Sequence, residues 1–374
     1  MINIMINIMD PNGEVHSPSH LVEEIYHYLN PYLQCYEHID LYEPGIGPGI
    51  FNQLYAFKEK TTYYGCEINP KYQHDSPIVH GDFFEQVLTS YDVILGNLPF
   101  NQGIVHTPCN KVLKQKSKTI WPLMLKKCVQ HLKPNGYGAF IIPCIWLKPD
   151  KENIYELLTS KKILYLKMFD CKESNQLFSY QCQTPICYVI FQNCPGNIRI
   201  IDHDKLIHFS LKKNYCIPSK NICLIQASFD FVQHHKSLEV IKVANTKKRN
   251  ETNDIKDCFN ITSLILPNEL KGFYSKTPGS YYEVPKIILA HKRLPIPFKD
   301  ISGQYGLYGR DIYIVIGEQL NIVYDFLCEP IVQTIIKSFN IRMNFYEKYI
   351  FDYIPDPRCC DVESYLSKLK HLSQ

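Results

Sequence analysis

The sequence of 374 residues lacks several features that would assign it directly to a class of protein. It has no C-x-x-C pair, and its 15 cysteines are an odd number, so neither a zinc site nor a complete disulfide framework is indicated. No apolar run approaches the roughly 18 residues of a membrane span, and the opening MINIMINIMD lacks the regions of a signal peptide. We therefore expect an intracellular, soluble protein that binds no membrane and no metal.

The net charge and the number of tryptophan residues are also low. The formal net charge of +3 is too small to indicate a nucleic-acid partner without local basic clusters. With 45% hydrophobic residues the chain can build a packed core, and its length favours two domains. The 27 tyrosines, against 2 tryptophans, fit either stacking surfaces or a bias in composition.

Short apolar runs alternate with helical segments in the first 200 residues. The segment 121–136 places Leu123, Leu125, Val129 and Leu132 at helical spacing before a Pro-Asn-Gly stop. Strands separated by such segments predict an α/β fold with a parallel, doubly wound sheet, in which the last two strands could form an antiparallel pair at the edge. The expected strands lie at 38–44, 61–68, 76–82, 91–97, 137–143, 161–170 and 184–192.

The regular alternation of predicted strands and helices stops beyond about residue 195, where Pro and Gly occur irregularly. We place a boundary at residue 200, which gives domains of residues 1–200 and 201–374. In the second domain the polar stretch 245–254 reads as a solvated loop. Its other expected elements are strands at 285–293 and 311–317 and a helix from Tyr324 to Phe339, which together predict an α+β domain.

The turn after the first expected strand, in DLYEPGIGPGIF, is rich in glycine. Gly45, Gly47 and Gly49 let the backbone approach a ligand closely, and a following helix N-terminus accepts a carboxylate or phosphate. The pattern is G-x-G-x-G rather than the G-x-G-x-x-G of a pyrophosphate-binding turn, which favours S-adenosylmethionine over a dinucleotide. Glu43, just before these glycines, either helps to hold the cationic methionine end or is structural.

Two further carboxylates end the second and third expected strands. Glu67 follows the glycine turn by about twenty residues, where an acidic group can accept from both hydroxyls of a ribose. Asp82 is placed to accept from an adenine amino group. Three carboxylates in this order at strand ends favour a ligand site over helix caps or solvated turns.

The fourth expected strand ends in GNLPF, where an amide, a proline and an aromatic ring follow closely. An exocyclic amine is a poor nucleophile because its lone pair is delocalised into its ring. The side-chain oxygen of Asn97 and a backbone carbonyl of the turn can accept its two hydrogens and direct the lone pair at a methyl sulfonium. Phe100 can stack on the base while Pro99 stiffens the turn. The segment predicts a clamp for an adenine amine that works by positioning and electrostatics.

These motifs resemble the N6-adenine DNA methyltransferases whose target-recognition domain follows the catalytic domain. The resemblance covers residue 14 to about residue 195. HSPSHLVEEIYHYL is similar to their N-terminal segment that closes over the cofactor, EPGIGPGIF to the cofactor loop, and NLPF to the catalytic N-P-P-[YF]. WPLMLKKCVQHLKPNGYGAFIIPCIW resembles their long helix and following strand, and FDYIPDP the tail of several such enzymes.

The resemblance implies a Rossmann-like, seven-stranded class I methyltransferase domain, a C-terminal α+β recognition domain, and S-adenosylmethionine as cofactor. The catalytic residues that it implies are Asn97, Leu98, Pro99 and Phe100. The cofactor-binding residues that it implies are Ser17, Pro18, Glu43, Pro44, Gly45, Gly47, Gly49, Glu67, Ile68, Asp82, Phe83 and Asn97.

One residue departs from the pattern of this family. Leu98 stands where these enzymes usually have a first Pro, and N-L-P-[FY] is typical of the ribosomal RNA adenine dimethyltransferases. We favour DNA because KVLKQKSKTIWPLMLKK and the large C-terminal region fit the DNA enzymes better, whereas the RNA enzymes usually end in a small helical domain. A fold that only binds nucleic acid and a protein-glutamine methyltransferase with a similar clamp are further alternatives.

An adenine in a duplex must be flipped out to reach such a clamp, at a cost of a few kcal/mol, so a second surface must grip the DNA. Three basic clusters can supply phosphate or base contacts. They are Lys111, Lys114, Lys116 and Lys118; Lys247, Lys248 and Arg249; and Lys292 and Arg293 with Arg310. We predict a monomeric, site-specific DNA adenine-N6 methyltransferase that acts on double-stranded DNA. No nuclease pattern is found, so cleavage would belong to a separate restriction endonuclease.

Overall fold

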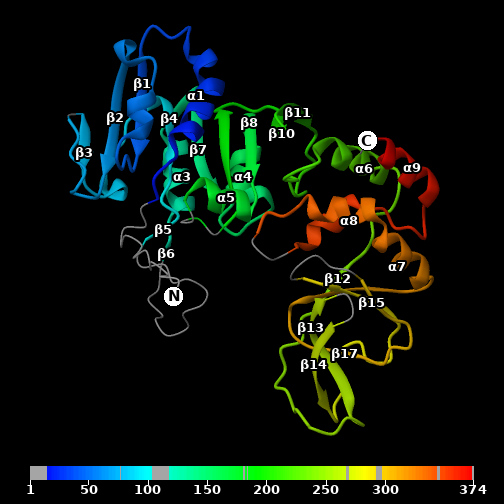
Figure 1. Ribbon diagram of the computed structural model, residues 1–374. Helices are drawn as coiled ribbons and strands as arrows, with labels where there is room; N and C mark the ends of the chain where they lie inside the picture. Colours follow the sequence, from blue (N-terminus) through cyan, green and yellow to red (C-terminus); the bar gives the residue numbers. More distant parts are fainter. Residues whose placement is uncertain are drawn as a thin grey trace, which may run out of the picture. The chain divides into compact units, whose positions relative to one another are not determined.

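The computed structural model divides into two compact units, residues 1–210 and 211–374 (Figure 1). The first unit extends past residue 200 because two strands between residues 198 and 209 pair with its sheet. The residues described are 15–75, 77–102, 118–179, 182, 184–266, 269–291, 297–342 and 346–372.

The first unit is built on one twisted, mostly parallel sheet. Over the described residues its order is β11-β10-β8-β9-β7-β4-β1-β2-β3, and β9 runs antiparallel to both of its neighbours. The α/β, Rossmann-like fold predicted from the sequence is therefore confirmed. The strands are β1 Ile39–Pro44, β2 Thr61–Glu67, β3 Ile78–His80, β4 Tyr91–Asn97, β7 Leu132–Pro143, β8 Lys162–Phe169, β9 Ile186–Gln192, β10 Ile198–Asp202 and β11 Lys205–Phe209.

Two details of this sheet differ from the expectation. All seven expected strands are present, and the antiparallel pairing of β8 with β9 is confirmed. The prediction that this pair forms the edge of the sheet is wrong, because both strands lie inside it. The edge is formed by β10 and β11, because the buried apolar residues Ile198, Ile200 and Ile201 let β10 continue the sheet beside β8. A short ribbon of β5 (Asn101–Gln102) and β6 (Lys118–Thr119) follows β4 separately.

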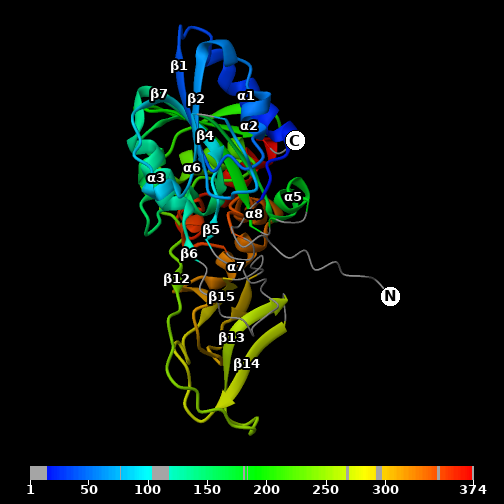
Figure 2. The same ribbon diagram turned by 90° about the vertical axis from the view of Figure 1, so that its left-hand side faces the viewer.

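Helices cover both faces of the sheet (Figure 2). One face packs against the apolar side of α1, where Leu21, Ile25 and Leu29 meet inward residues of the central strands. The helix expected at 121–136 ends earlier, at Gln130, and leaves Leu123 40% exposed. The helices are α1 Ser19–Leu33, α2 Ile50–Leu54, α3 Trp121–Gln130, α4 Ile154–Thr159 and α5 Cys171–Leu177.

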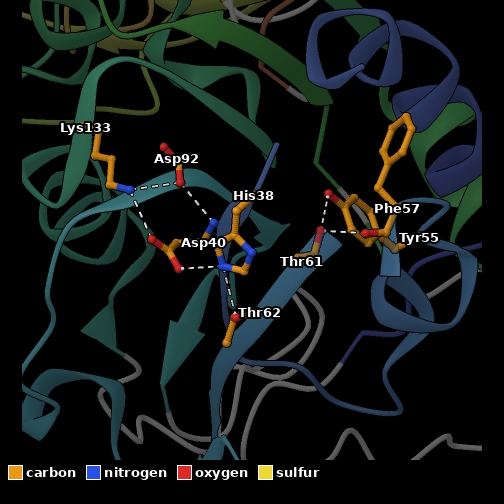
Figure 3. A network of polar contacts seen from close by, with 8 residues as sticks. All are labelled: His38, Asp40, Tyr55, Phe57, Thr61, Thr62, Asp92 and Lys133. Carbon is orange, nitrogen blue, oxygen red and sulfur yellow. Dashed lines mark hydrogen bonds and ion pairs between the residues drawn. The ribbon is translucent and has the colours of Figure 1, made fainter. Parts of the chain in front are cut away.

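Charged residues at the amino ends of the central strands pair with one another (Figure 3). Lys133 Nζ lies 3.1 Å from the Asp40 carboxylate and 2.9 Å from the Asp92 carboxylate, and the Asp92 carboxylate also accepts a hydrogen bond from the Asp40 backbone N–H. This network ties β1 to β4 at the edge opposite the one to which the predicted site residues belong. No helix in the described part of the chain is long and apolar enough to cross a membrane.

The second unit combines two small sheets, one antiparallel and one in which β17 pairs with β13 in parallel, with helices, as expected for an α+β domain. One sheet has the order β12-β18-β15-β16 and another the order β14-β13-β17. The helix expected from Tyr324 to Phe339 is two helices, because Pro330 starts a new one. The elements are β12 Ile241–Lys242, β13 Cys258–Leu266, β14 Glu269–Ser275, β15 Lys286–Ala290, β16 Phe298–Asp300, β17 Gly306–Leu307, β18 Ile312–Ile316, α6 Ile222–Val232, α7 Leu320–Cys328, α8 Pro330–Lys337 and α9 Val362–Leu372.

Candidate active site

The glycine-rich loop joins β1 to α2 at the carboxyl edge of the sheet, which is the side where the parallel strands end. Gly45, Gly47 and Gly49 have φ values of +75°, +55° and +80°, which favour glycine at each position. Backbone N–H groups of Gly45 and Ile46 donate to the carbonyl of Cys66 at the end of β2. A Cβ atom added at Gly47 would meet no other atom within 4 Å, so the backbone there borders open space. The loop is a place where a ligand can approach the main chain.

Glu67, expected to bind a ribose, holds the loop itself. Its two carboxylate oxygens accept hydrogen bonds from the backbone N–H groups of Gly47, at 2.6 Å, and of Asn69, at 2.7 Å. The side chain is buried, while the adjacent Ile68 is 51% exposed. Each carboxylate oxygen keeps a second lone pair, so a further hydroxyl donor can still be accepted. Glu67 therefore orders the loop in addition to any contact with a ligand.

Asp82 and Phe83 follow β3 at the same edge. The Asp82 carboxylate accepts from the backbone N–H of Phe84 at 2.9 Å and caps a short 3₁₀ turn, Phe83–Glu85. Asp82 is half-buried. Phe83 is buried, with the Lys127 ammonium 4.9 Å above its ring centroid. The carboxylate is thus available at the surface, whereas the ring belongs to the packed interior.

Glu43 lies beneath the glycine loop at the end of β1 and is buried. Burial raises the pKa of Glu43 to about 8; a hydrogen bond from the Tyr63 hydroxyl opposes that rise, and the charge of Glu67 adds to it. The carboxyl group is also close to Gly96 of β4, where an added Cβ would lie 3.5 Å from Glu43 Cγ. Glu43 is an uncompensated acidic group packed behind the loop. Pro44, the last residue of β1, is buried as well.

The predicted clamp follows β4 directly. Asn97 ends the strand, and the Leu98 side chain is only 1% exposed, so Leu98 packs inward at the position that departs from the family pattern. Pro99 and Phe100 are half-buried. Pro99 Cδ would lie 3.7 Å from a Cβ atom at Gly45, which places the clamp turn directly beside the glycine loop.

The segment before α1 reaches this turn. The Asn97 side-chain Nδ2 donates to the backbone carbonyl of Val15 at 3.1 Å. Ser17 and Pro18 are half-buried, and the Pro18 carbonyl accepts from the N–H groups of the first helical turn, which begins α1. The N-terminal segment that the resemblance placed over the cofactor therefore touches the clamp residue in this structure.

The predicted nucleic-acid contacts are placed only in part. Lys111, Lys114, Lys116, Lys292 and Arg293 lie outside the described residues, and for Lys118 the backbone alone is described, in β6. Arg310, and Lys247 to Arg249, are exposed on the second unit. The structure tests none of these contacts, and they stay predictions.

Several residues at the carboxyl edge were not singled out from the sequence. The ring of His74 approaches the glycine loop, with Nε2 2.9 Å from the carbonyl of Gly47. The Tyr72 hydroxyl meets the imidazole of His16 at 2.9 Å. Tyr72 and His74 lie between β2 and β3, where no motif or periodicity distinguishes them, and His16 precedes α1, so only the folded chain reveals these contacts.

Comparisons with known proteins find likeness at the level of the fold. No family model matches the sequence, and no curated protein matches it. The M protein of the type I restriction enzyme EcoKI is 15% identical, with a TM-score of 0.38 over 51% of this chain and 48% of that chain. An RNA methyltransferase from Salinibacter ruber, solved with S-adenosyl-L-homocysteine, is 13% identical, with a TM-score of 0.29 over 49% and 95%. A methyltransferase from Pyrococcus furiosus is 16% identical, with a TM-score of 0.28 over 46% and 83%. The chain spans about half the length of the type I restriction-system proteins that it matches.

Proposed function

We propose that the chain is an S-adenosylmethionine-dependent, site-specific DNA adenine-N6 methyltransferase. The observation that carries the proposal is the contact between the two loops of the carboxyl edge, where Pro99 of the clamp turn lies against Gly45 of the glycine loop. A methyl donor held by one loop and an amine held by the other would be neighbours. Such proximity is what a direct transfer between two bound reactants requires.

The residues at this edge fit the proposed cofactor. Open space over Gly47 admits a ligand close to the backbone, and the exposed aliphatic side chain of Ile68 offers a surface for a base. The half-buried carboxylate of Asp82 can accept from an adenine amino group. Glu43 is buried behind the loop, where the charge of a cationic ligand would favour the ionised form of its carboxyl group. When bound, S-adenosylmethionine supplies a methyl group activated on a sulfonium.

The clamp turn supplies what the target amine needs. The Asn97 Oδ1 atom and a backbone carbonyl of the turn accept the two amine hydrogens, which directs the nitrogen lone pair toward the methyl group. The half-buried ring of Phe100 stacks on the base, and Pro99 limits movement of the turn. The inward-facing Leu98 leaves this arrangement of acceptors intact, because only its backbone faces the turn.

Recognition of DNA is assigned to the second unit, with cleavage left to a separate protein and the enzyme acting as a monomer. Backbone hydrogen bonds hold both ends of the segment 245–252, which carries the exposed cluster 247–249. The Arg249 guanidinium lies 5.2 Å above the ring of Phe273 and 3.6 Å from the Glu251 carboxylate. A basic cluster on an anchored segment is suited to contacts with phosphate groups.

The test is to incubate the purified protein with methyl-labelled S-adenosylmethionine and, separately, with unmethylated duplex DNA and ribosomal RNA, and then to analyse the nucleosides. We expect label on N6-methyldeoxyadenosine. Label on dimethyladenosine from RNA alone would overturn the choice of DNA. Absence of label on both, in a protein that still binds the cofactor, would overturn the proposed reaction.

Substitution of Asn97 tests the role of the clamp most directly. Asn97→Ala removes the side-chain acceptor, so we expect kcat to fall by about 100-fold or more. Binding of S-adenosylmethionine, measured by calorimetry, should change little because the glycine loop is untouched. Methyl transfer at close to the wild-type rate by Asn97→Ala would contradict the role of the clamp.

A further inference from the structure

The N-terminal segment Val15–Pro18, called the strap below, contacts the clamp through the backbone of Val15. We propose that the strap is a positioning element that fixes the orientation of the Asn97 side-chain amide. The inference rests on the proposed function, because it names what prepares Asn97 for the target amine. The two residues that carry it are separated by 82 positions in the chain, so the contact is a product of the fold.

The hydrogen bond to Val15 determines which atom of the amide faces outward. The Asn97 Nδ2 donates to the Val15 carbonyl at 3.1 Å, and the opposite orientation would set two oxygens against each other. The Oδ1 atom of Asn97 accepts no hydrogen bond from the described residues. It is therefore left as an acceptor. A flipped amide would present N–H groups to the N–H groups of an adenine amine, which would repel them.

A chain of contacts fastens the strap to the glycine loop. The carboxylate of Glu67 accepts from the N–H of Gly47 and from that of Asn69. The carbonyl of Asn69 accepts from the N–H of Tyr72, and the Tyr72 hydroxyl meets the imidazole of His16 in the strap. The same segment thus contacts the clamp at one residue and the loop system at the next.

The strap is also held by packing. Val15 lies against the core cluster formed by α1 and the central strands, and Phe100 of the clamp turn lies against the same cluster. The strap and the turn therefore share one apolar support. Loosening the polar tether between His16 and Tyr72 should increase the freedom of the Val15 carbonyl without unfolding the unit.

Tyr72→Phe removes the hydroxyl of the tether and keeps the ring. In the 374-residue chain we expect kcat to fall roughly two- to tenfold, the range that the loss of one hydrogen bond gives, with little change in the dissociation constant of S-adenosylmethionine. Tyr64→Phe is the matched control, because no hydrogen bond of the Tyr64 hydroxyl is found in the described part of the chain. It should leave kcat unchanged.

The decisive measurement repeats Tyr72→Phe in an Asn97→Asp background, by single-turnover kinetics with excess enzyme. A carboxylate at position 97 cannot donate to the Val15 carbonyl and is repelled by it, so a looser strap should leave the rate unchanged or raise it. Equal losses in both backgrounds, or equal effects of Tyr72→Phe and Tyr64→Phe, would overturn the positioning role.

A readout without methyl transfer separates this inference from the proposed function. The side-chain amide signals of Asn97 in a ¹⁵N spectrum, identified by their loss in Asn97→Asp, should shift in Tyr72→Phe and stay fixed in Tyr64→Phe. If the wild-type protein methylates no nucleic acid while these shifts occur, the proposed function fails and the contact stands. If the signals do not respond to Tyr72→Phe, the inference itself fails.

Discussion

In the large sheet of the first unit, the edge where the parallel strands begin (the amino edge) and the edge where they end (the carboxyl edge) differ in how their charged residues are paired. At the amino edge, opposite charges compensate one another, since Lys133 bridges Asp40 and Asp92 (Figure 3). At the carboxyl edge, no cation pairs with the buried Glu43 among the described residues, and its hydrogen-bond partner is the hydroxyl of Tyr63. The amino edge pairs its charged groups with one another, whereas the carboxyl edge buries Glu43 with no cation beside it among the described residues.

This difference has an energetic meaning. An uncompensated carboxyl group in the interior lowers stability unless it is protonated, and a chain shaped by stability alone would pair it or replace it. Groups of this kind concentrate at functional sites, because a ligand supplies the missing partner. The contrast therefore supports a ligand site at the carboxyl edge, and it can be tested by perturbing one edge at a time.

The largest effect on stability is expected at Glu43. Its pKa in the folded protein is about 8, against an ordinary value of 4.5, so the folded state binds more protons than the unfolded chain between these pH values. The stabilising contribution is complete below pH 4.5 and is lost as the pH rises to 8. Glu43→Gln should remove this loss, because glutamine does not ionise. The unfolding free energy of the variant should therefore exceed that of the wild type by several kcal/mol at pH 8.5, and the two should be similar at pH 4.

Thermal and urea unfolding across this pH range provide the measurement. Glu37→Gln, at an exposed position of the same unit, is the control and should follow the wild-type curve. An unfolding free energy of Glu43→Gln that parallels that of the wild type at every pH would mean that Glu43 is compensated, and the contrast between the edges would not hold.

A smaller effect is expected at the amino edge. Lys133→Met leaves the carboxylates of Asp40 and Asp92 without their shared cation, but the Lys133 side chain is 37% exposed and solvent screens the charges. We expect a loss of about 1 kcal/mol in unfolding free energy. The kcat for methyl transfer should not change, because this network lies at the edge opposite the site.

Lys162→Met serves as the control for this substitution. Lys162 begins β8, and no ion pair of its side chain is found among the described residues. A tenfold fall in kcat for Lys133→Met at unchanged stability would show that the two edges are coupled. The conclusion that the amino edge serves stability alone would then be wrong.

The sequence predicted the carboxyl edge well because its signals are local. Apolar runs that end in Gly45, Glu67, Asp82 and Asn97 show both the strands and the polar residues at their ends, and the structure has β1 to β4 at those places. Glycine in the left-handed region is a property of a few neighbouring residues, so the loop could be expected without any knowledge of the fold.

What the sequence did not predict depends on contacts between distant residues. The hydrogen bond from Asn97 to Val15, and those from Gly47 and Asn69 to Glu67, are visible only after folding. The insertion of β9 between β7 and β8 was missed for the same reason, since a continuous apolar run is equally suited to the edge or the middle of a sheet. In the second unit, the pairing of β13 with β17 likewise joins segments with no common motif.

A comparably small effect on stability, and the most direct test of the carboxyl edge, is expected at Gly47. Its φ of +55° makes Gly47→Ala cost about 1 kcal/mol, and the added Cβ meets nothing within 4 Å. Gly65→Ala, in β2 under the same loop, would instead place its Cβ 2.8 Å from the backbone carbonyl oxygen of Glu43 and lower stability more. If the space over Gly47 belongs to the cofactor, calorimetry should show a tenfold or greater loss of S-adenosylmethionine affinity for Gly47→Ala, larger than its small loss of stability explains. Unchanged affinity would mean that the glycine serves the turn alone, and that the open space at this edge is not where the ligand lies.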